Sequence, residues 1–422
     1  MTLVEAVSPI QPMTRRELSI QLAGARQKSD ELFATLRPRY LYERPIRERH
    51  RAIFYVGHLD AFDYIQICRA GLGQTSSEPA LDSLFQAGID PDSDHLPTDK
   101  ERDWPRHDEV LRYAAQARAA VDRALETAPE PAIHMAIEHR MMHLETLAYM
   151  WHNFDHSMKL KPVPGGEAGD NGVNGAGPER EENGWCEIPG GPVVLGKPRD
   201  GSFGWDNEYD EHTVDVPAFA IARHKVTNRE YLRFVQAGAP KPHFWSERNG
   251  RLFYRGMFEE LPLPLDWPVY VTHHEAKAYC DWAGKSLPSE AQFQRAAFGT
   301  PGEGIRRYPW GDAAPVWELG NFDFKRWDPE PVYAAPQNRS AFGVQQLVGN
   351  GWEWTDTVFG PFAGFEAAPS YPGYSADFFD GKHYVLKGAS PRTAAKLMRR
   401  SFRNWFRPDY PYVYATFRCL ER

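Results

Sequence analysis

The chain has 422 residues, which is long for one hydrophobic core, so two domains are predicted. Its composition is that of a globular protein, with 42% hydrophobic and 25% charged residues. The net charge is -8, whereas a nucleic-acid-binding protein presents a basic face, so no nucleic-acid partner is expected. The first residues lack the apolar run of a signal peptide, and no stretch is long enough to span a membrane. A cytoplasmic protein without a membrane partner is therefore expected.

Four helices are predicted in the first part of the chain, followed by a polar seam. The Pro-containing stretch 88–107 is the one long connection between helices, which favours an up-down four-helix bundle over residues 1–160. The seam at residues 161–184 is rich in Gly, Asn and Glu, as in a flexible linker or long loop. The helical segments are residues 15–35, 48–70, 108–127 and 132–152.

The last predicted helix contains HMAIEHRMMHLETLAYM, residues 134–150, which is apolar nearly all round and so is typical of a buried helix. His139 and His143 are four residues apart and share one face, so their imidazoles can bind one metal ion. Two unrelated core histidines fit this spacing as well. The second predicted helix offers His58 among apolar residues as a third ligand. His152 and His156 lie at the end of the helix and are expected to be solvated.

Residues 185–422 read as an irregular α+β domain. Short strand-like runs such as GGPVVLG, FAIARHKVT and HYVLKGA alternate with Pro, Gly and Asn. The clearest helices are VTNREYLRFVQAG and THHEAKAYCDWAG. The four cysteines are widely separated in the sequence and form no C-x-x-C, so neither a disulfide framework nor a cysteine zinc site is predicted (Cys68, Cys186, Cys280 and Cys419).

Several motifs of this second part occur in a fixed order: PVYVTHHEAKAYCDWAGKSLPSEAQFQRAA, YPWGD, VGNGWEWT, VLKGAS and a closing FR. Together they resemble the formylglycine-generating-enzyme/sulfatase-modifying-factor domain, a C-type-lectin-like fold, over nearly all of residues 186–422. The first part resembles a DinB-type four-helix bundle with H-x-x-x-H-x-E ending at Glu145. The combination is similar to the ergothioneine- and ovothiol-type sulfoxide synthases. These are non-haem iron enzymes that use oxygen to join sulfur to the imidazole of a histidine derivative.

The resemblance implies a two-domain α+β protein with Fe(II) bound by His58, His139 and His143. Imidazole suits Fe(II), although three histidines with open positions also fit catalytic zinc. Tyr371 of YPGYSADFFDG takes the role of catalytic proton or electron donor; by itself, Tyr-Pro-Gly-Tyr is typical of a plain turn. The substrate-contacting positions implied are Tyr374, Asn404 and Trp405, and Trp405 can hold a trimethylammonium group by cation–π attraction.

The chain departs from the bacterial enzymes of this superfamily that use γ-glutamylcysteine. Phe406 stands where they have Asp, Tyr410 where they have Arg, and Met142 where they have Gln; an expected loop Arg has no clear counterpart, although Arg102 is nearby. A carboxylate-bearing thiol needs fixed cations to offset its desolvation, so these apolar and neutral residues favour a neutral donor. The selenoneine synthase branch, which joins a selenosugar to hercynine (trimethylhistidine), fits best.

Other functions remain open from the residues. A thiol such as cysteine or γ-glutamylcysteine can be the donor of an ergothioneine- or ovothiol-type enzyme. A zinc-dependent thiol transferase is a rival that would not need oxygen, and a non-catalytic ligand-binding homologue is a third reading. Formylglycine-generating enzymes use a pair of copper-binding cysteines near the C-terminal end, where this chain has only Cys419, so that activity is not expected.

Overall fold

The computed structural model describes residues 13–86, 88, 96–162, 183–302 and 304–422. These residues form two compact units, a bundle unit of residues 13–162 and a C-terminal unit of residues 183–422. Most of the predicted linker at 161–184 lies outside the described residues. The described helices include none that is long and apolar enough to cross a membrane.

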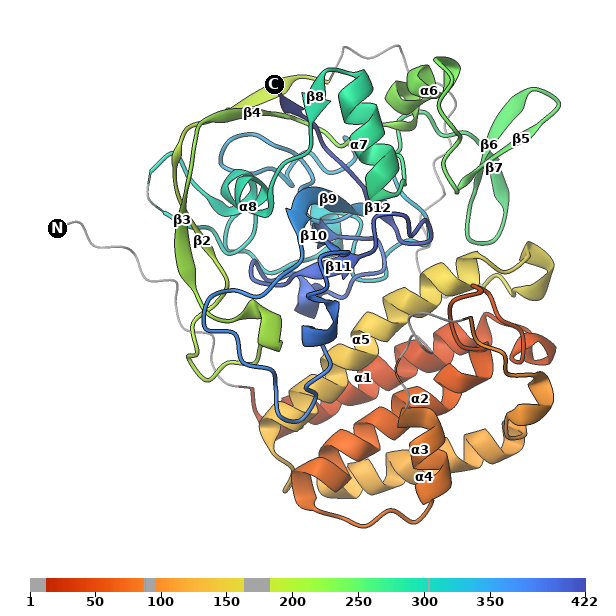
Figure 1. The fold of residues 1–422 in the computed structure, drawn as a ribbon. Helices are drawn as coiled ribbons and strands as arrows, with labels where there is room; N and C mark the ends of the chain where they lie inside the picture. Colours follow the sequence, from red (N-terminus) through yellow and green to blue (C-terminus); the bar gives the residue numbers. More distant parts are fainter. Residues whose placement is uncertain (1–12, 87, 89–95, 163–182, 303) are drawn as a thin grey trace. The chain divides into compact units, whose positions relative to one another are not determined.

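Four long helices build the bundle unit, in which α2 packs on α4 and α1 packs on α5 (Figure 1). Their bounds are α1 Arg15–Ala34, α2 Ala52–Tyr64, α4 His107–Ala124 and α5 Glu130–His152. A π-helical turn, Ile65–Ala70, continues α2, and a short helix that the sequence did not predict, α3 Pro79–Gln86, packs against α2. Short 3-10 turns lie at Pro38–Tyr40, Glu101–Asp103 and His156–Met158. The predicted four-helix architecture is thus present, with one added helix.

Two details of the bundle prediction were wrong. The α2 helix begins at Ala52, four residues later than predicted, because Arg51 is extended and its guanidinium donates to Asp99 Oδ2 at 2.9 Å and to Tyr42 O at 2.6 Å. His152 was expected to be solvated, but only 1% of it is exposed. The 3-10 turn after α5 folds back, and Lys159 Nζ donates to the His152 carbonyl at 3.3 Å.

The C-terminal unit contains four small sheets (Figure 1). The first has the order β1–β4–β13–β8 (Trp185–Ile188, Phe219–Ala222, Leu420–Glu421, Lys285–Ser286). The second has the order β11–β10–β9–β12 (Asn404–Phe406, Tyr384–Ala389, Gly351–Val358, Ala415–Thr416). The others are β2–β3 (Gly191–Leu195, His212–Val216) and β5–β6–β7 (Trp245–Arg248, Arg251–Arg255, Glu260–Pro262). Such short strands separated by loops match the α+β prediction.

Each of the three helices of this unit begins with a capping box, in which a Ser or Thr and an acid or amide three residues later satisfy each other's backbone N–H groups. The cap residues are Thr227, Thr272 and Ser289, and the helices are α6 Asn228–Gln236, α7 His273–Trp282 and α8 Glu290–Phe298. These boxes fix where helices begin inside a mostly irregular segment.

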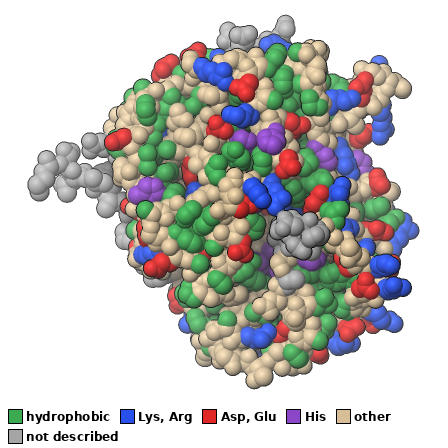
Figure 2. Space-filling view, viewed as in Figure 1, with side chains coloured by type: hydrophobic (Ala, Val, Ile, Leu, Met, Phe, Trp, Pro, Cys, Tyr) green, Lys and Arg blue, Asp and Glu red, His purple; other side chains and the backbone are tan. Residues whose placement is uncertain are grey.

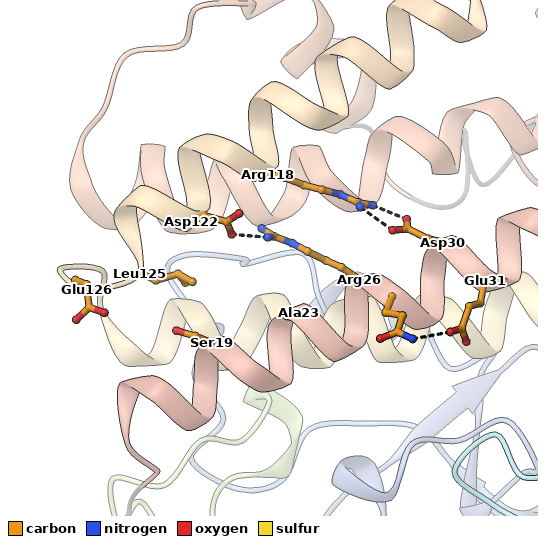
Figure 3. A pocket seen from close by; sticks show the side chains of 10 residues that line it. Ser19, Ala23, Arg26, Asp30, Glu31, Arg118, Asp122, Leu125 and Glu126 are labelled. Atoms are coloured by element: carbon orange, nitrogen blue, oxygen red, sulfur yellow. Dashed lines mark hydrogen bonds and ion pairs between the residues drawn. The ribbon is translucent and has the colours of Figure 1, made fainter.

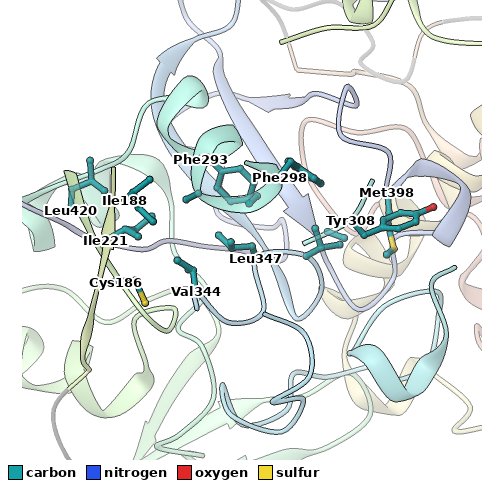
Figure 4. Packing of buried hydrophobic residues seen from close by; sticks show 14 of the residues in the cluster. Cys186, Ile188, Ile221, Phe293, Phe298, Tyr308, Val344, Leu347, Met398 and Leu420 are labelled. Carbon is teal, nitrogen blue, oxygen red and sulfur yellow. The ribbon is translucent and has the colours of Figure 1, made fainter. Parts of the chain in front are cut away.

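The core of the C-terminal unit lies where α8 meets the two four-stranded sheets. Phe293 and Phe298 of α8 pack there with Val344, Leu347 and other residues of the loops (Figure 4). A second anchor is ionic: Glu353 on β9 is fully buried and lies 3.0 Å from both Lys225 Nζ and an Arg418 nitrogen. Because these partners come from distant parts of the chain, they hold β9 and its neighbour β10 in place. The loop that connects β9 to β10 carries the predicted catalytic residue Tyr371.

Charged side chains of both signs are spread over the visible face of the protein. Lys and Arg are interspersed with Asp and Glu there and do not gather into one basic patch (Figure 2). This distribution is consistent with the acidic net charge of -8.

Candidate metal centre and aromatic cluster

Three buried histidines converge inside the bundle unit. His58 on α2 lies opposite His139 and His143 on α5, with exposed fractions of 4%, 3% and 6%. The Nε2 atom of His143 is 3.2 Å from that of His58 and 3.1 Å from that of His139. Among the described residues, this is the one group of three metal-ligating side chains whose donor atoms all lie within 4.8 Å of one another.

The backbone carbonyl of Phe85 fixes the orientation of His58. The His58 Nδ1 atom lies 2.7 Å from Phe85 O, so Nδ1–H donates and Nε2 keeps its lone pair toward the other two imidazoles. Phe85 belongs to α3, the helix that was not predicted. The Phe85 ring packs on Gly57, where an added Cβ would lie 2.5 Å from the ring carbons. Gly57 therefore lets α3 come close enough for Phe85 O to orient the ring of the neighbouring His58.

The environment keeps all three rings neutral. Burial lowers the pKa of His58 to about 4, and burial together with the other imidazoles lowers the pKa values of His139 and His143 well below the usual range. The aromatic neighbours account for part of this burial: Phe62 stacks on His139 at a centroid distance of 3.4 Å and Phe54 stacks on His58 at 4.9 Å. Neutral imidazole is the form that binds a metal.

This arrangement fits a metal ion better than it fits three satisfied core histidines. The Phe85 contact leaves a lone pair on His58 Nε2 that faces the other two rings, and His143 Nδ1 has no acceptor among the described residues that would hold its N–H group away from the centre. A hydrogen bond from one neutral Nε2–H can relieve the repulsion between rings, whereas a metal ion between the rings would accept all three nitrogens at once. Metal–nitrogen bonds of about 2.0–2.1 Å at right angles place neighbouring nitrogens about 3 Å apart, close to the observed separations. A facial set of three nitrogens leaves neighbouring coordination positions open for substrates.

A buried ionic cluster beside the histidines joins all four long helices. Arg140, which follows His139 on α5 and is 0% exposed, donates to Asp60 and Asp63 of α2 at 2.6 Å each and to Ser29 of α1 at 3.0 Å. Arg118 of α4 donates to Asp60 at 3.0 Å. The cluster sets the register of α2 against α5, on which the convergence of the histidines depends.

A surface cavity of the bundle unit does not contain the histidines. It is a groove of about 690 Å³ along α1 and α4. Its charged lining is already paired: Arg26 with Asp122, and Arg118 with Asp30 (Figure 3). A ligand would have to break these ion pairs, so the groove is not a candidate active site.

In the C-terminal unit, the predicted tyrosines lie in a compact turn between β9 and β10. Tyr371 N donates to Ala368 O at 3.0 Å and Tyr374 N donates to Tyr371 O at 3.2 Å. The two rings are 5.8 Å apart. Burial, and then the charge of Asp377, raise the pKa of the Tyr371 phenol, so the hydroxyl stays protonated at neutral pH and can donate a proton.

Trp405 is the centre of an aromatic cluster that includes Tyr374. Its ring stacks on Phe359 at 4.3 Å and meets Tyr374 and Phe378 at 5.4 and 5.6 Å. The neighbouring Asn404 accepts a hydrogen bond from Trp405 N through Oδ1 at 2.9 Å, which leaves its Nδ2 group as the donor. The structure thus brings Tyr371, Tyr374 and Trp405 together in one unit.

Phe406 and Tyr410 form a stacked pair. Their centroids are 5.5 Å apart with an angle of 6° between the planes. The charged residues between them in sequence, Arg407 and Asp409, line a different cavity of about 330 Å³ with Lys382 and other residues. Two neutral ring faces therefore occupy the positions that the resemblance associates with an acid–base clamp.

Some features could not be predicted from local sequence. Met142, the third departure, is half-buried on α5 beside His143 in the bundle unit. No local pattern indicated that Phe85 or Arg140 supports the histidines, because those contacts join different helices. Cys280 and Cys419 are far apart in the sequence, yet their buried sulfur atoms lie 3.6 Å apart as free thiols.

Comparisons with known proteins agree with the organisation of both units. Residues 172–422 match the family described as the sulfatase-modifying factor enzyme 1-like domain. A hercynine oxygenase from Mycolicibacterium thermoresistibile is 33% identical over 440 aligned positions, covering 95% of this chain and 94% of that protein. Ergothioneine biosynthesis protein 1 from Neurospora crassa is 28% identical over 90% of this chain, which spans only 55% of the fungal protein.

Among solved structures, PvdO from Pseudomonas aeruginosa is similar over 56% of this chain and 93% of its own length, with 23% identity and a TM-score of 0.41.

Proposed function

We propose that the protein joins selenium or sulfur to the imidazole of hercynine with oxygen. The chain carries the sulfatase-modifying factor enzyme 1-like domain and belongs to the ergothioneine-type sulfoxide synthases. The cofactor proposed is Fe(II), and the donor proposed is a selenosugar. Hercynine, the donor and O2 are the small-molecule partners. A thiol donor such as cysteine or γ-glutamylcysteine defines the alternative, an ergothioneine- or ovothiol-type enzyme.

The proposed reaction balances with one molecule of oxygen. A selenol R–SeH and the imidazole C–H of hercynine lose their hydrogens, a C–Se bond forms, one oxygen atom goes to selenium and the other leaves as water. The product is an imidazolyl selenoxide. Iron, when bound, supplies the site at which oxygen and the donor are activated. The residues of the chain must hold it, orient the substrates and move protons.

The observation that carries the metal assignment is that Nε2 of His143 lies 3.2 Å from that of His58 and 3.1 Å from that of His139, in a buried group whose donor atoms all lie within 4.8 Å of one another. His58, His139 and His143 would hold the ion, and Phe85 O orients one of them. Zinc satisfies the same three nitrogens, so the family and the requirement for oxygen favour iron.

Tyr371 is proposed as the proton or electron donor during coupling. Its raised pKa keeps the hydroxyl protonated near neutral pH, which a proton donor requires. A positioned acid of this kind contributes roughly 10²–10⁴-fold to a rate. Its loss would favour a side reaction in which the donor is oxidised without forming the C–Se bond.

The Trp405 cluster is proposed to recognise hercynine. A trimethylammonium group is bound by aromatic faces within about 6 Å of the ring centroid, and Trp is the best of them. The Trp405 and Tyr374 rings meet edge to face, with centroids 5.4 Å apart and an angle of 82° between the planes. The Asn404 amide can donate to a substrate carboxylate, because its oxygen is already engaged by the backbone.

The stacked pair of Phe406 and Tyr410 supports a neutral donor. A carboxylate or ammonium group loses its hydration on binding, and neither ring provides an opposite charge to compensate. Each charge-assisted hydrogen bond that is missing costs about 1.5–3 kcal/mol. The apolar face of a sugar ring loses nothing there and can pack on either ring. A selenol is more ionised than a thiol at neutral pH, and the resulting selenolate suits an open coordination position.

The test is to load the protein anaerobically with Fe(II) and then assay hercynine in air with a selenosugar, a thiosugar, cysteine and γ-glutamylcysteine separately. Efficiency should fall in that order. Zinc-loaded protein and iron-loaded protein without oxygen are the controls, and both should be inactive.

Three results would contradict parts of the proposal. Efficient use of γ-glutamylcysteine with no turnover of the selenosugar would leave an ergothioneine-type synthase. Oxygen-independent transfer by the zinc form would indicate a thiol transferase. Tight hercynine binding without turnover of any donor would indicate a non-catalytic homologue.

A further inference from the structure

A turn far away in the sequence holds the loop that carries the two tyrosines. Asp206 is 5% exposed, and its Oδ1 accepts a hydrogen bond from the fully buried hydroxyl of Ser375, the residue after Tyr374. Burial raises the pKa of the Asp206 carboxyl, and the Ser375 hydroxyl and the Ala368 N–H oppose that rise. Ala368 and Ser375 are the two ends of the turn that contains Tyr371 and Tyr374.

A second contact comes from the residue next to Asp206. The Trp205 ring is 2% exposed and stacks on Tyr374 at a centroid distance of 4.0 Å with an angle of 23°. The carboxylate therefore holds the Ser375 end of the tyrosine turn, while the indole stacks on the ring of Tyr374. Both contacts come from neighbouring residues, so they act as one support.

The support is itself rigidly attached. Asp206 begins a 3-10 turn, Asp206–Glu208, and Glu208 is 0% exposed. Glu208 accepts from Trp205 N at 2.9 Å, from Arg399 Nε at 2.7 Å and from Ser401 Oγ at 2.7 Å. This links the turn to the segment that leads into β11, which carries Asn404 and Trp405. A buried ionised acid with three hydrogen-bond donors is a strong anchor.

We propose that Asp206 is a positioning residue for the coupling reaction, which holds the 368–375 turn so that the Tyr371 hydroxyl is presented in one orientation. This inference rests on the proposed function, because it gives Asp206 its effect through Tyr371. Tyr371 itself sits in a Tyr-Pro-Gly-Tyr turn whose glycine could otherwise adopt many conformations. An unsupported turn would present the phenol only part of the time, and the loss would appear in the proton-transfer step.

The variants are Asp206→Ala, Asp206→Asn and Ser375→Ala, with Asp215→Ala as the matched control because Asp215 is an exposed acid on β3 of the same unit. Amide hydrogen exchange is measured across residues 368–378, without any substrate. Asp206→Ala should speed exchange there by roughly ten- to a hundredfold, the equivalent of one lost charge-assisted hydrogen bond. Asp206→Asn keeps an acceptor oxygen for Ser375 and should lose much less, and the control should not change.

The second measurement is the partition of the donor between coupled product and oxidised donor. Asp206→Ala should lower kcat for coupling by the same roughly ten- to hundredfold and raise the oxidised fraction, with a smaller effect on the KM for hercynine. The double variant Asp206→Ala/Tyr371→Phe should lose no more than Tyr371→Phe alone, because both changes remove the same step.

Two kinds of failure can be told apart. If wild-type protein couples hercynine but exchange in the turn is unchanged, or the two losses multiply in the double variant, the role of Asp206 is overturned and the proposed function stands. If wild-type protein couples no donor, both are overturned. Ser375→Ala, which removes the other partner of the same bond, gives the same decision if Asp206→Ala does not fold.

Discussion

The three histidines stand on two long helices, whereas Tyr371 and Tyr374 stand on a turn between β9 and β10 that is held by contacts from residues more than 160 positions away. In the helices, spacing alone decides which side chains share a face, so His139 and His143 had to point the same way. In the turn, no periodicity exists, and orientation comes from the tertiary partners Asp206 and Trp205. The proposed metal ligands are thus positioned by helix periodicity, and the proposed proton donor by tertiary contacts.

This contrast predicts that the two regions respond differently to substitution. Changes at the histidines should remove the metal and with it all chemistry. Changes at the turn should leave metal and substrate binding in place and alter the outcome of the reaction.

The largest effect is expected from the histidines themselves. Replacement of His58, His139 or His143 by Ala should abolish both Fe(II) binding and turnover, because two imidazoles do not hold iron firmly in an otherwise apolar pocket. Iron per chain after anaerobic loading and desalting is the measurement, with circular dichroism to confirm folding. His134→Ala on the same helix is the control and should keep its iron. Full iron and activity in His58→Ala would show that α2 does not contribute a ligand.

The next effect is expected from Tyr371→Phe. Coupling should fall by roughly 10²–10⁴-fold, the usual contribution of a positioned acid, while hercynine still binds. Calorimetry gives the affinity for hercynine and mass spectrometry gives the ratio of coupled product to oxidised donor. If coupling were unchanged, Tyr371 would be only a turn residue, and the turn would have no role in the reaction.

A large effect on stability is expected from Arg140→Met. The change removes Arg140 from both buried acids. Of the described residues, Asp60 then keeps only Arg118 as an ionic partner, and Asp63 keeps only Arg26, at 3.7 Å. Breaking a buried ion pair from one side costs about 3–5 kcal/mol. Urea unfolding of the bundle, followed by tryptophan fluorescence, measures the loss. Arg112→Met on the exposed face of α4 is the control and should change little. Equal stability of the two variants would mean that the ionic cluster does not hold α2 against α5.

A smaller effect is expected from Gly57→Ala. The added Cβ would lie 2.5 Å from the Phe85 ring, so α3 must shift, and such overpacking costs about 1–3 kcal/mol. The Phe85 carbonyl moves with it, so Fe(II) affinity should fall by roughly 10–100-fold, as for other changes in groups that orient metal ligands. Gly24→Ala on α1 is the matched control: it meets no atom within 4 Å and should stabilise the protein by up to about 1 kcal/mol. Unchanged iron affinity in Gly57→Ala would show that the Phe85 contact does not tune the site.

The same contrast explains how far the sequence could predict the structure. The long helices and the pairing of His139 with His143 follow from periodic patterns within single segments. Phe85 and α3 were missed because an eight-residue helix has too few turns to show a period. Arg140 reads as an ordinary polar residue until Asp60 and Asp63 are seen on the facing helix.

In the C-terminal unit, ordered family motifs predicted the fold and the candidate residues, but no local pattern predicted their support. The hydrogen bond between Asp206 and Ser375 joins positions 169 residues apart, so it cannot be predicted from the residues around either position. The approach of Cys280 to Cys419 was missed for the same reason.

Donor choice is proposed to depend on Phe406 and Tyr410 of the C-terminal unit, and one competition experiment tests this most directly. Iron-loaded wild-type protein and the double variant Phe406→Asp/Tyr410→Arg each receive limiting hercynine with equal amounts of selenosugar and γ-glutamylcysteine in air, and mass spectrometry gives the ratio of C–Se to C–S product. Wild type should give mainly the selenium product. The variant should shift the ratio toward sulfur without reversing it fully, because Met142 is unchanged. A wild-type product that is mainly the γ-glutamylcysteine adduct, with a ratio that the double variant does not move, would contradict the account.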